Sequence, residues 1–226
     1  MTERVMIVTG ALGALGRVML ERAAEAGWTC AGIDAAGSAT SLAGAAILAP
    51  VDLSSSEAAA AAIERIARDH GRIDALVNVA GGFAWEPIQD GSSERWSDLF
   101  AINVLTALNT SRAALPWLEK VPDGGRIVNV GANAAARADS GMGPYAAAKA
   151  GVHKLTESLA SECRGRVRVN AVLPSILDTA ANRRDMPEAD FGLWVTPQQL
   201  ATVILFLASD EASAVTGALV PVTGRL

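Results

Sequence analysis

The chain of 226 residues is long enough to bury one substantial core, and we expect a single domain over residues 1–226. Half of the residues are hydrophobic, and 24 Asp and Glu against 19 Lys and Arg give a net charge of −5. Because no block of Lys or Arg interrupts this balance, nucleic acids and anionic membranes are not expected partners.

The first ten residues, MTERVMIVTG, lead directly into an apolar strand and lack the pattern of a secretory signal, so we expect a cytoplasmic protein. No apolar run approaches the roughly 18 uncharged residues that cross a bilayer. Cys30 and Cys163 lie far apart, without a CxxC pair or a His at ligand spacing. We therefore expect ordinary buried thiols, no disulfide and no metal site.

Short runs rich in Val and Ile alternate with longer segments of helical period, which indicates βαβ units around a parallel sheet. Strands are predicted over 5–9, 29–33, 46–51, 75–79, 126–130, 168–173 and 218–222. Helices are predicted over 14–26, 57–69, 96–118, 144–162 and 197–208. The expected fold is α/β, a doubly wound parallel sheet of seven strands of Rossmann type.

Two helix starts carry capping sequences, Ser54 with Glu57 and Thr196 with Gln199 after Pro197. The stretch 174–195 has almost no periodicity, and we expect a substrate lid at about 175–195.

Glycines 10, 13 and 16 follow the first strand and open the first helix, where a backbone can approach a pyrophosphate. Asp34 ends the next strand, eighteen residues past Gly16. A carboxylate there can bind ribose hydroxyls and repels a 2′-phosphate, so the sequence predicts NAD(H), with NADP(H) less favoured. Arg17 is the one nearby cation that argues the other way. Asp52 either contacts adenine or caps the following helix.

Tyr145 and Lys149 are four residues apart in a predicted helix and therefore share one face. A neighbouring ammonium and the charge of an oxidised nicotinamide would both favour the phenolate, so we expect a lowered pKa for Tyr145. The alternative is a Tyr/Lys pair on a solvated helix face.

These features resemble the short-chain dehydrogenase/reductase family over almost the whole chain. Its marks are the glycine loop 10–16, Asn78-Val79-Ala80-Gly81, Asn103, Tyr145-Ala-Ala-Ala-Lys149, Asn170 before Pro174, Thr179, and Val215-Thr216-Gly217.

The resemblance implies that Tyr145 is the general acid or base, that Lys149 holds the nicotinamide ribose, and that Asn103 anchors a water relay. For Asn103, an amide satisfied by the backbone is the alternative. Thr179 and the backbone at Leu177 would bind the carboxamide. The implied cofactor site comprises Gly10, Leu12, Gly13, Leu15, Gly16, Asp34, Asp52, Leu53, Asn78, Ala80, Gly81, Lys149, Pro174, Leu177 and Thr179.

The sequence departs from the family where a serine normally lies thirteen residues before the tyrosine, because Ala132 stands there. The displaced Gly13 and the residues after Gly131 resemble the quinonoid dihydropteridine reductase branch, which lacks the same serine. Hydride entering a conjugated ring spreads negative charge, so no localised oxyanion needs a dedicated donor.

The resemblance favours NADH-dependent reduction of a conjugated imine or quinonoid substrate. The alternatives are a carbonyl or 3-oxoacyl reductase or alcohol dehydrogenase, with Asn133 or Ser140 replacing the missing hydroxyl, and a dinucleotide-binding protein without turnover. A homodimer or homotetramer through the helices holding Asn103 and Tyr145 is implied. Candidate substrate contacts are Asn133, Tyr145, Trp85 and Trp194, with Phe83 and Phe191 as further aromatics.

Overall fold

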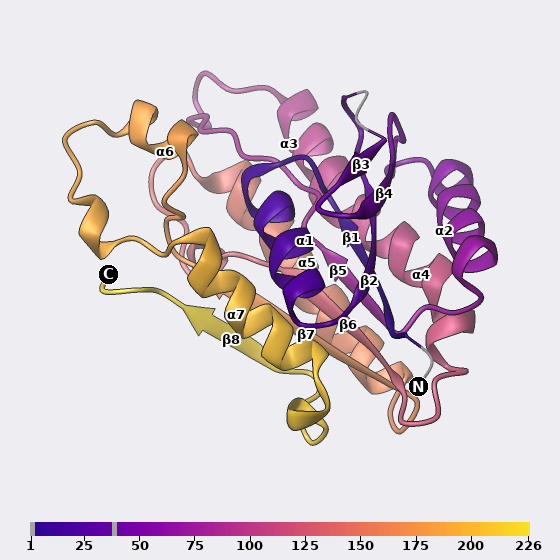
Figure 1. The fold of residues 1–226 in the computed structure, drawn as a ribbon. Helices are drawn as coiled ribbons and strands as arrows, with labels where there is room; N and C mark the ends of the chain where they lie inside the picture. Colours follow the sequence, from indigo (N-terminus) through magenta and orange to yellow (C-terminus); the bar gives the residue numbers. More distant parts are fainter. Residues whose placement is uncertain (1–2, 38–39) are drawn as a thin grey trace.

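The computed structural model describes residues 3–37 and 40–226, so four residues of the expected domain 1–226 lie outside it. These ranges form an eight-stranded sheet in the order β3-β4-β2-β1-β5-β6-β7-β8 (Figure 1). All neighbours pair in parallel except β3 with β4. The strands are β1 Val5–Thr9, β2 Thr29–Ile33, β3 Ser41–Leu42, β4 Ala45–Leu48, β5 Ala75–Asn78, β6 Gly125–Val130, β7 Val167–Pro174 and β8 Leu219–Val222.

The predicted fold class is confirmed, but the predicted number of strands is wrong. The additional strand, β3, has two residues and pairs antiparallel with β4 through a tight hairpin. Both hairpin residues have positive φ, Ala43 at 50° and Gly44 at 80°. A turn with positive φ at both positions has the twist that a two-residue connection between antiparallel strands requires. Because β3 is so short and Ala rarely adopts positive φ, the sequence carries little signal for it.

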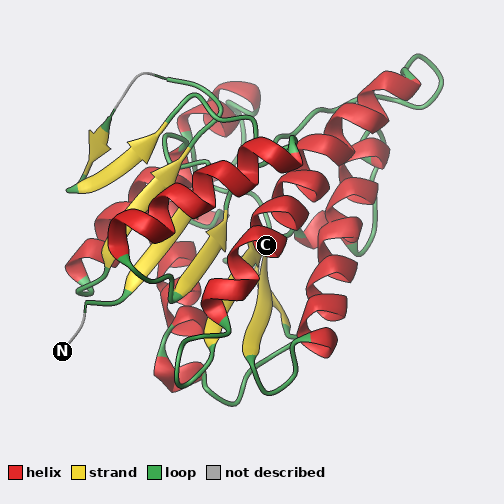
Figure 2. Ribbon diagram, turned by 90° about the vertical axis from the view of Figure 1, so that its right-hand side faces the viewer, coloured by secondary structure: helices red, strands yellow, loops and turns green. Residues whose placement is uncertain are grey.

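Helices cover both faces of the sheet (Figures 1 and 2). α1 (Ala14–Glu25) and α7 (Pro197–Ala208) pack together on one face. α2 (Ser56–His70), α4 (Thr106–Leu118) and α5 (Gly143–Glu162) cover the other face, and α3 (Ser93–Phe100) lies against α5. Since successive strand residues point to opposite faces, Met6 and Val8 pack toward α1 and α7, whereas Ile7 packs toward α2.

The predicted helix over 96–118 is interrupted. α3 ends at Phe100, a π-helical turn spans Ala101–Leu105, and α4 begins at Thr106. Such turns concentrate at functional sites, and Asn103 lies inside this one. The sequence analysis predicted one continuous helix because a π-helical turn is a local bulge within a helix and does not end it.

Of the two predicted caps, one is confirmed and one is wrong. Thr196 and Gln199 form a capping box at the start of α7. At α2 the cap is Ser55, whose hydroxyl accepts from the N–H of Ala58 at 3.3 Å. Ser54 instead donates through its hydroxyl to Asp52 at 2.7 Å, so this hydroxyl does not cap α2.

The stretch 175–195 is more ordered than its sequence indicated, because it contains α6 (Ala180–Asp185) and a 3₁₀ turn at Phe191–Leu193. Thr179 caps α6 by accepting from the N–H of Asn182, and Arg183 forms two hydrogen bonds with Asp178. Both cysteines are free and buried, as expected. Among the residues that the structure describes, no helix is both long and apolar enough to span a membrane.

The chain reverses its direction of strand addition at β1, which has β2 on one side and β5 on the other. Ligands of open α/β sheets bind outside the carboxyl ends of the strands at such a point. Thr9, at the end of β1, joins the two strand ends because its hydroxyl accepts from the N–H groups of Val79 and Ala80.

Candidate active site

A cavity of about 800 Å³ lies at this reversal point. It brings together the glycine loop after β1, the end of β2, the segment after β5 and the first turns of α5. Its lining residues are Gly10, Leu12, Gly13, Ala14, Leu15, Arg17, Asp34, Ala35, Ala36, Gly37, Val51, Asp52, Leu53, Val79, Ala80, Gly81, Gly82, Phe83, Ile102, Thr106, Val130, Tyr145, Lys149 and Leu177.

The glycine loop exposes backbone to the cavity because side chains would not fit there. Gly10 has a φ of +61°, and a Cβ on Gly16 would lie 2.1 Å from the carbonyl oxygen of Gly10. Gly13 caps α1 without any side-chain hydrogen bond to the first turn. The N–H groups of that turn therefore face a site suited to an anion, so the loop fits the pyrophosphate of a dinucleotide.

Asp34 lies beside this loop and is held by it. One carboxylate oxygen accepts from the N–H of Leu12 at 2.8 Å, and the other accepts from the N–H of Ala36 at 3.0 Å. Arg17 donates through Nε to the carbonyl oxygen of Leu12 at 2.8 Å and also lines the cavity. A fixed carboxylate and a nearby guanidinium thus face the same end of the cavity, with opposite preferences for a 2′-phosphate.

Asp52 and Leu53 lie further along the same wall of the cavity. Asp52 accepts from both the N–H and the hydroxyl of Ser54, and these two bonds lower its pKa. The carboxylate therefore remains charged at the cavity edge. Asp52 therefore orders the residue before the Ser55 cap of α2, and it also lines the cavity, where a contact with adenine remains a prediction.

Tyr145 and Lys149 point into the opposite end of the cavity from the first turns of α5. The ammonium of Lys149 lies 6.0 Å from the centre of the Tyr145 ring and donates to the carbonyl oxygen of Val130 at 2.8 Å. Burial raises the pKa of Tyr145 to about 12 and lowers the pKa of Lys149 to about 8.

This burial acts against the lowered pKa that we expected from the lysine ammonium and the nicotinamide charge together. The phenol lies in an apolar wall where its charged form loses hydration, an effect that the sequence analysis did not include. Lys149 is itself buried and bonded to the backbone, which reduces its effect on the phenol. At neutral pH the phenol of Tyr145 is therefore uncharged, whereas Lys149 still carries its proton in most molecules.

Asn103 lies behind the site and does not line the cavity. Its amide donates to the carbonyl oxygens of Leu99 and Gly82 and accepts weakly from the N–H of Gly82. A Cβ on Gly81 would lie 2.6 Å from Oδ1 of Asn103 and 3.3 Å from Nζ of Lys149. The structure therefore shows an amide satisfied by backbone, which holds the segment after β5 against the lysine.

Several other residues of the implied cofactor site support the cavity from outside. Asn78 is buried between Ser111 and Asn129, Gly16 backs the glycine loop, and Pro174 ends β7. Thr179 caps α6, while Leu177 lines the cavity and accepts from the Asn182 amide.

Of the aromatic and amide side chains predicted as substrate contacts, some line the cavity and others do not. Trp194 is buried against Phe191 with ring centres 4.8 Å apart, so it is a packing residue of the stretch 175–195. Asn133 is exposed and Ala132 is buried, and neither lines the cavity. Trp85 donates to the carbonyl oxygen of Ser140 and is likewise absent from the lining. Phe83, by contrast, lines the cavity beside Tyr145.

One residue near the site was missed by the sequence analysis. His153 is buried, and its Nε2 accepts from the N–H of Ala132 at 3.4 Å. Burial and the charge of Lys149 lower the pKa of His153. The available signal was its position four residues after Lys149, on the same helical face.

Comparison with known proteins agrees with this geometry. The short chain dehydrogenase family matches residues 4–190. The 3-oxoacyl-(acyl-carrier-protein) reductase FabG of Pseudomonas aeruginosa is 34% identical, and the alignment covers 99% of this chain and 97% of the relative.

Two solved structures superpose over nearly the full chain. The ligand-free aldohexose dehydrogenase of Thermoplasma acidophilum has a TM-score of 0.90 at 28% identity, with 99% of this chain and 94% of that chain covered. An NAD⁺-bound xylitol dehydrogenase has a TM-score of 0.88 at 27% identity, with 98% of each chain covered. Family members bind a nicotinamide dinucleotide, and the loop, cavity and Tyr–Lys pair described above fit that group. The chain therefore belongs to the short-chain dehydrogenase/reductase family and is an oxidoreductase of that family.

Proposed function

We propose that this protein transfers hydride between NAD(H) and a small organic substrate, with Tyr145 as the proton donor or acceptor. The observation that carries the proposal is that one cavity holds the glycine loop and Asp34 at one end and Tyr145 with Lys149 at the other. The reaction NADH + H⁺ + C=X → NAD⁺ + HC–XH balances with one proton, which the phenol can supply. The bound cofactor supplies the hydride.

The residues of the chain bind and orient the cofactor and supply the proton. The glycine loop binds the pyrophosphate, and Asp34 binds the adenosine ribose and disfavours a 2′-phosphate. Lys149 holds the nicotinamide ribose and, together with a cationic nicotinamide, lowers the pKa of Tyr145 from its raised value. Asn103 and Gly81 keep the lysine in place. The phenol of Tyr145 lines the cavity beside Lys149, so its proton at Oη can be passed to a substrate bound there.

The first candidate substrate is a carbonyl compound. The support is that the curated relative is a 3-oxoacyl reductase and that the solved structures are sugar and polyol dehydrogenases. In carbonyl reduction the developing alkoxide sits on one oxygen, and Tyr145 is the protein donor that the cavity offers to it.

The second candidate is a conjugated C=N or quinonoid substrate of dihydropteridine type. The observation that favours it is Ala132, a buried methyl at the position of the usual serine donor. A conjugated substrate distributes its charge and needs no second donor.

A screen of NADH oxidation tests the proposal, using saturated ketones, 3-oxoacyl thioesters, quinones, imines and quinonoid pterins with wild type and Tyr145→Phe. We expect turnover of at least one class and loss of most of it in the variant. If NADH binds tightly but no class is turned over, the chain is a dinucleotide-binding protein without catalysis. Turnover that survives in Tyr145→Phe would overturn the assignment of the proton donor.

A further inference from the structure

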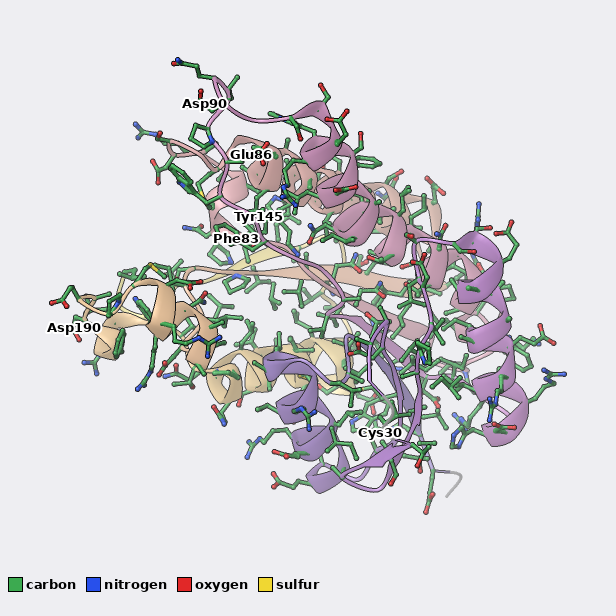
Figure 3. The ribbon with its side chains drawn as sticks, turned by 90° about the horizontal axis from the view of Figure 1, so that it is seen from above. Cys30, Phe83, Glu86, Asp90, Tyr145 and Asp190 are labelled. Carbon is green, nitrogen blue, oxygen red and sulfur yellow. The ribbon has the colours of Figure 1, made fainter. Side chains whose placement is uncertain are left out.

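Phe83 presents a large apolar surface at the catalytic end of the cavity. Its ring lies edge-on to Tyr145, with centres 5.0 Å apart and planes at 80°. Despite this contact, Phe83 is 56% exposed, and it lines the cavity. Figure 3 shows the two labelled residues side by side. An exposed aromatic face next to a proton donor is a surface that a ligand can cover.

The backbone beside Phe83 is held to the loop that leads into α5. Trp85 donates through Nε1 to the carbonyl oxygen of Ser140 at 2.9 Å, and the N–H of Glu86 donates to the carbonyl oxygen of Gly141 at 2.8 Å. Gly141 has a φ of +74°, and a Cβ there would lie 2.2 Å from the Trp85 indole. The indole is therefore seated directly on the backbone of Gly141, four residues before Tyr145.

The other end of this segment is fixed to α3. The Glu86 carboxylate accepts from the N–H of Ser92 and from Nε of Arg95. These bonds lower the pKa of Glu86, so the anchor is charged at neutral pH. The segment carrying Phe83 is thus braced on both sides, and its exposed ring is held rather than free to fold away.

We propose that Phe83 is a specificity-determining residue, whose ring is the wall on which a flat conjugated substrate stacks beside Tyr145, and that Trp85 is the positioning residue that holds this wall. The inference rests on the proposed function and names its substrate class, a planar conjugated carbonyl or C=N compound. A flat substrate parallel to the Phe83 ring carries its C=O or C=N in its own plane. Its polar edge can therefore reach the phenol while its face covers the ring.

This substrate class also accounts for the methyl of Ala132. Conjugation removes the concentrated charge that a second donor would stabilise, and stacking replaces the lost hydrogen bond as a source of binding free energy. A saturated substrate of the same size would gain neither contribution at this wall.

The test compares Phe83→Leu with wild type on a flat aryl-conjugated ketone or quinone and on a saturated cyclic ketone of similar size. Leucine keeps apolar bulk but removes the aromatic face. Phe206→Leu, at an exposed phenylalanine of α7, is the matched control. We expect Phe83→Leu to raise KM for the flat substrate about fivefold, the range of one aromatic pair, and to leave the saturated substrate and the NADH Kd unchanged.

Trp85→Phe tests the positioning role, because it removes the donor to Ser140 and keeps a ring on Gly141. We expect a raised KM for the flat substrate, with an unchanged KM for the saturated one and an unchanged NADH Kd. A merely destabilising change would alter all three. Thermal unfolding of each variant establishes that it is folded at the assay temperature.

Calorimetric binding of a flat, non-reducible analogue to the NAD⁺ complex separates this inference from the proposed function. Suppose that wild type turns over a substrate, but Phe83→Leu weakens the binding of flat and saturated compounds equally or leaves both unchanged. The inference is then wrong and the proposed function stands. If no compound is turned over but the analogue binds in a manner that depends on Phe83, the inference stands and the proposed function fails. Absence of both turnover and analogue binding overturns both.

Discussion

The carboxylate of Asp34 accepts a hydrogen bond from the N–H of Leu12 at 2.8 Å, which joins the end of β2 to the glycine loop after β1. A single side chain thereby shapes the loop and places a negative charge at the ribose end of the cavity. Substitutions of Asp34 can separate these two roles, because one variant removes only the charge and another removes the hydrogen bond as well.

We expect wild type to bind NADH more tightly than NADPH by at least about tenfold, or about 1.4 kcal/mol, because the Asp34 charge opposes a 2′-phosphate. Asp34→Asn keeps an oxygen that can accept from Leu12 and should narrow the difference. Asp34→Ala should narrow it and also weaken NADH, since the Leu12 N–H loses its partner. Titration calorimetry measures the dissociation constants of NADH and NADPH for wild type and for both variants. Equal affinities of wild type for NADH and NADPH would show that Arg17 offsets the effect of Asp34, and tighter binding of NADPH would show that Arg17 outweighs it.

Tyr145→Phe should abolish most turnover and leave NADH binding nearly intact, because the phenol acts on the proton. Tyr145 is the only tyrosine, so an ultraviolet difference titration of wild type against the variant reports its ionisation alone. We expect a midpoint near 12 for the protein alone, since burial raises this pKa to about 12. Added NAD⁺ should lower the midpoint through its positive nicotinamide. A midpoint that NAD⁺ leaves unchanged would remove the basis for phenolate catalysis.

Lys149→Met should abolish turnover and change the pH dependence of folding stability. Burial lowers the Lys149 pKa to about 8, against 10.5 for an ordinary lysine. Between these values the unfolded chain binds more protons than the folded chain, so the stability contributed by this residue rises with pH. In denaturant unfolding, the free energy of unfolding of wild type should therefore rise relative to that of Lys149→Met from about pH 8 upward. Lys154→Met, at an exposed lysine of the same helix, should show no such trend.

Ala132→Ser separates the two substrate candidates. A hydroxyl that donates to a localised alkoxide is commonly worth about 2.7 to 4 kcal/mol. If the substrate is conjugated, wild type should reduce saturated ketones slowly, and Ala132→Ser should gain activity on them. Turnover of a conjugated substrate should stay about the same. Ala132→Cys, with similar size and a weak donor, is the control. Efficient reduction of saturated ketones by wild type, removed by Asn133→Ala, would identify Asn133 as the substitute donor.

The protein should be a homodimer or homotetramer in solution. Trp96 and Phe100, one turn apart on α3, are 41% and 46% exposed, and paired apolar side chains of this size favour an interface. Light scattering after gel filtration should give a multiple of the chain mass, and Phe100→Glu should reduce it. Ala60→Glu, on the exposed face of α2, should not. A monomeric wild type would contradict the expectation.

The sequence was enough to predict the alternation of strands and helices, the glycine loop, Asp34 and the Tyr145–Lys149 pair. Each of these depends on local spacing: period two or 3.6 for the elements, and four residues for a shared helical face. Such signals lie within a few neighbouring residues and can be recognised without knowledge of the fold. They were sufficient for the fold class and the family.

The sequence could not predict which aromatic side chain lines the cavity or how burial shifts the Tyr145 pKa. Nothing in the sequence distinguishes Trp85, Trp194 and Phe83 as substrate contacts. In the structure Trp85 packs on Gly141, Trp194 is buried in the stretch 175–195, and Phe83 lines the cavity. Tyr145 and Phe83 are 62 positions apart, and their contact exists only because β5 and α5 deliver them to the same edge of the sheet. Burial is a property of packed neighbours, and the desolvation that raises the phenol pKa is set by segments that local spacing does not connect.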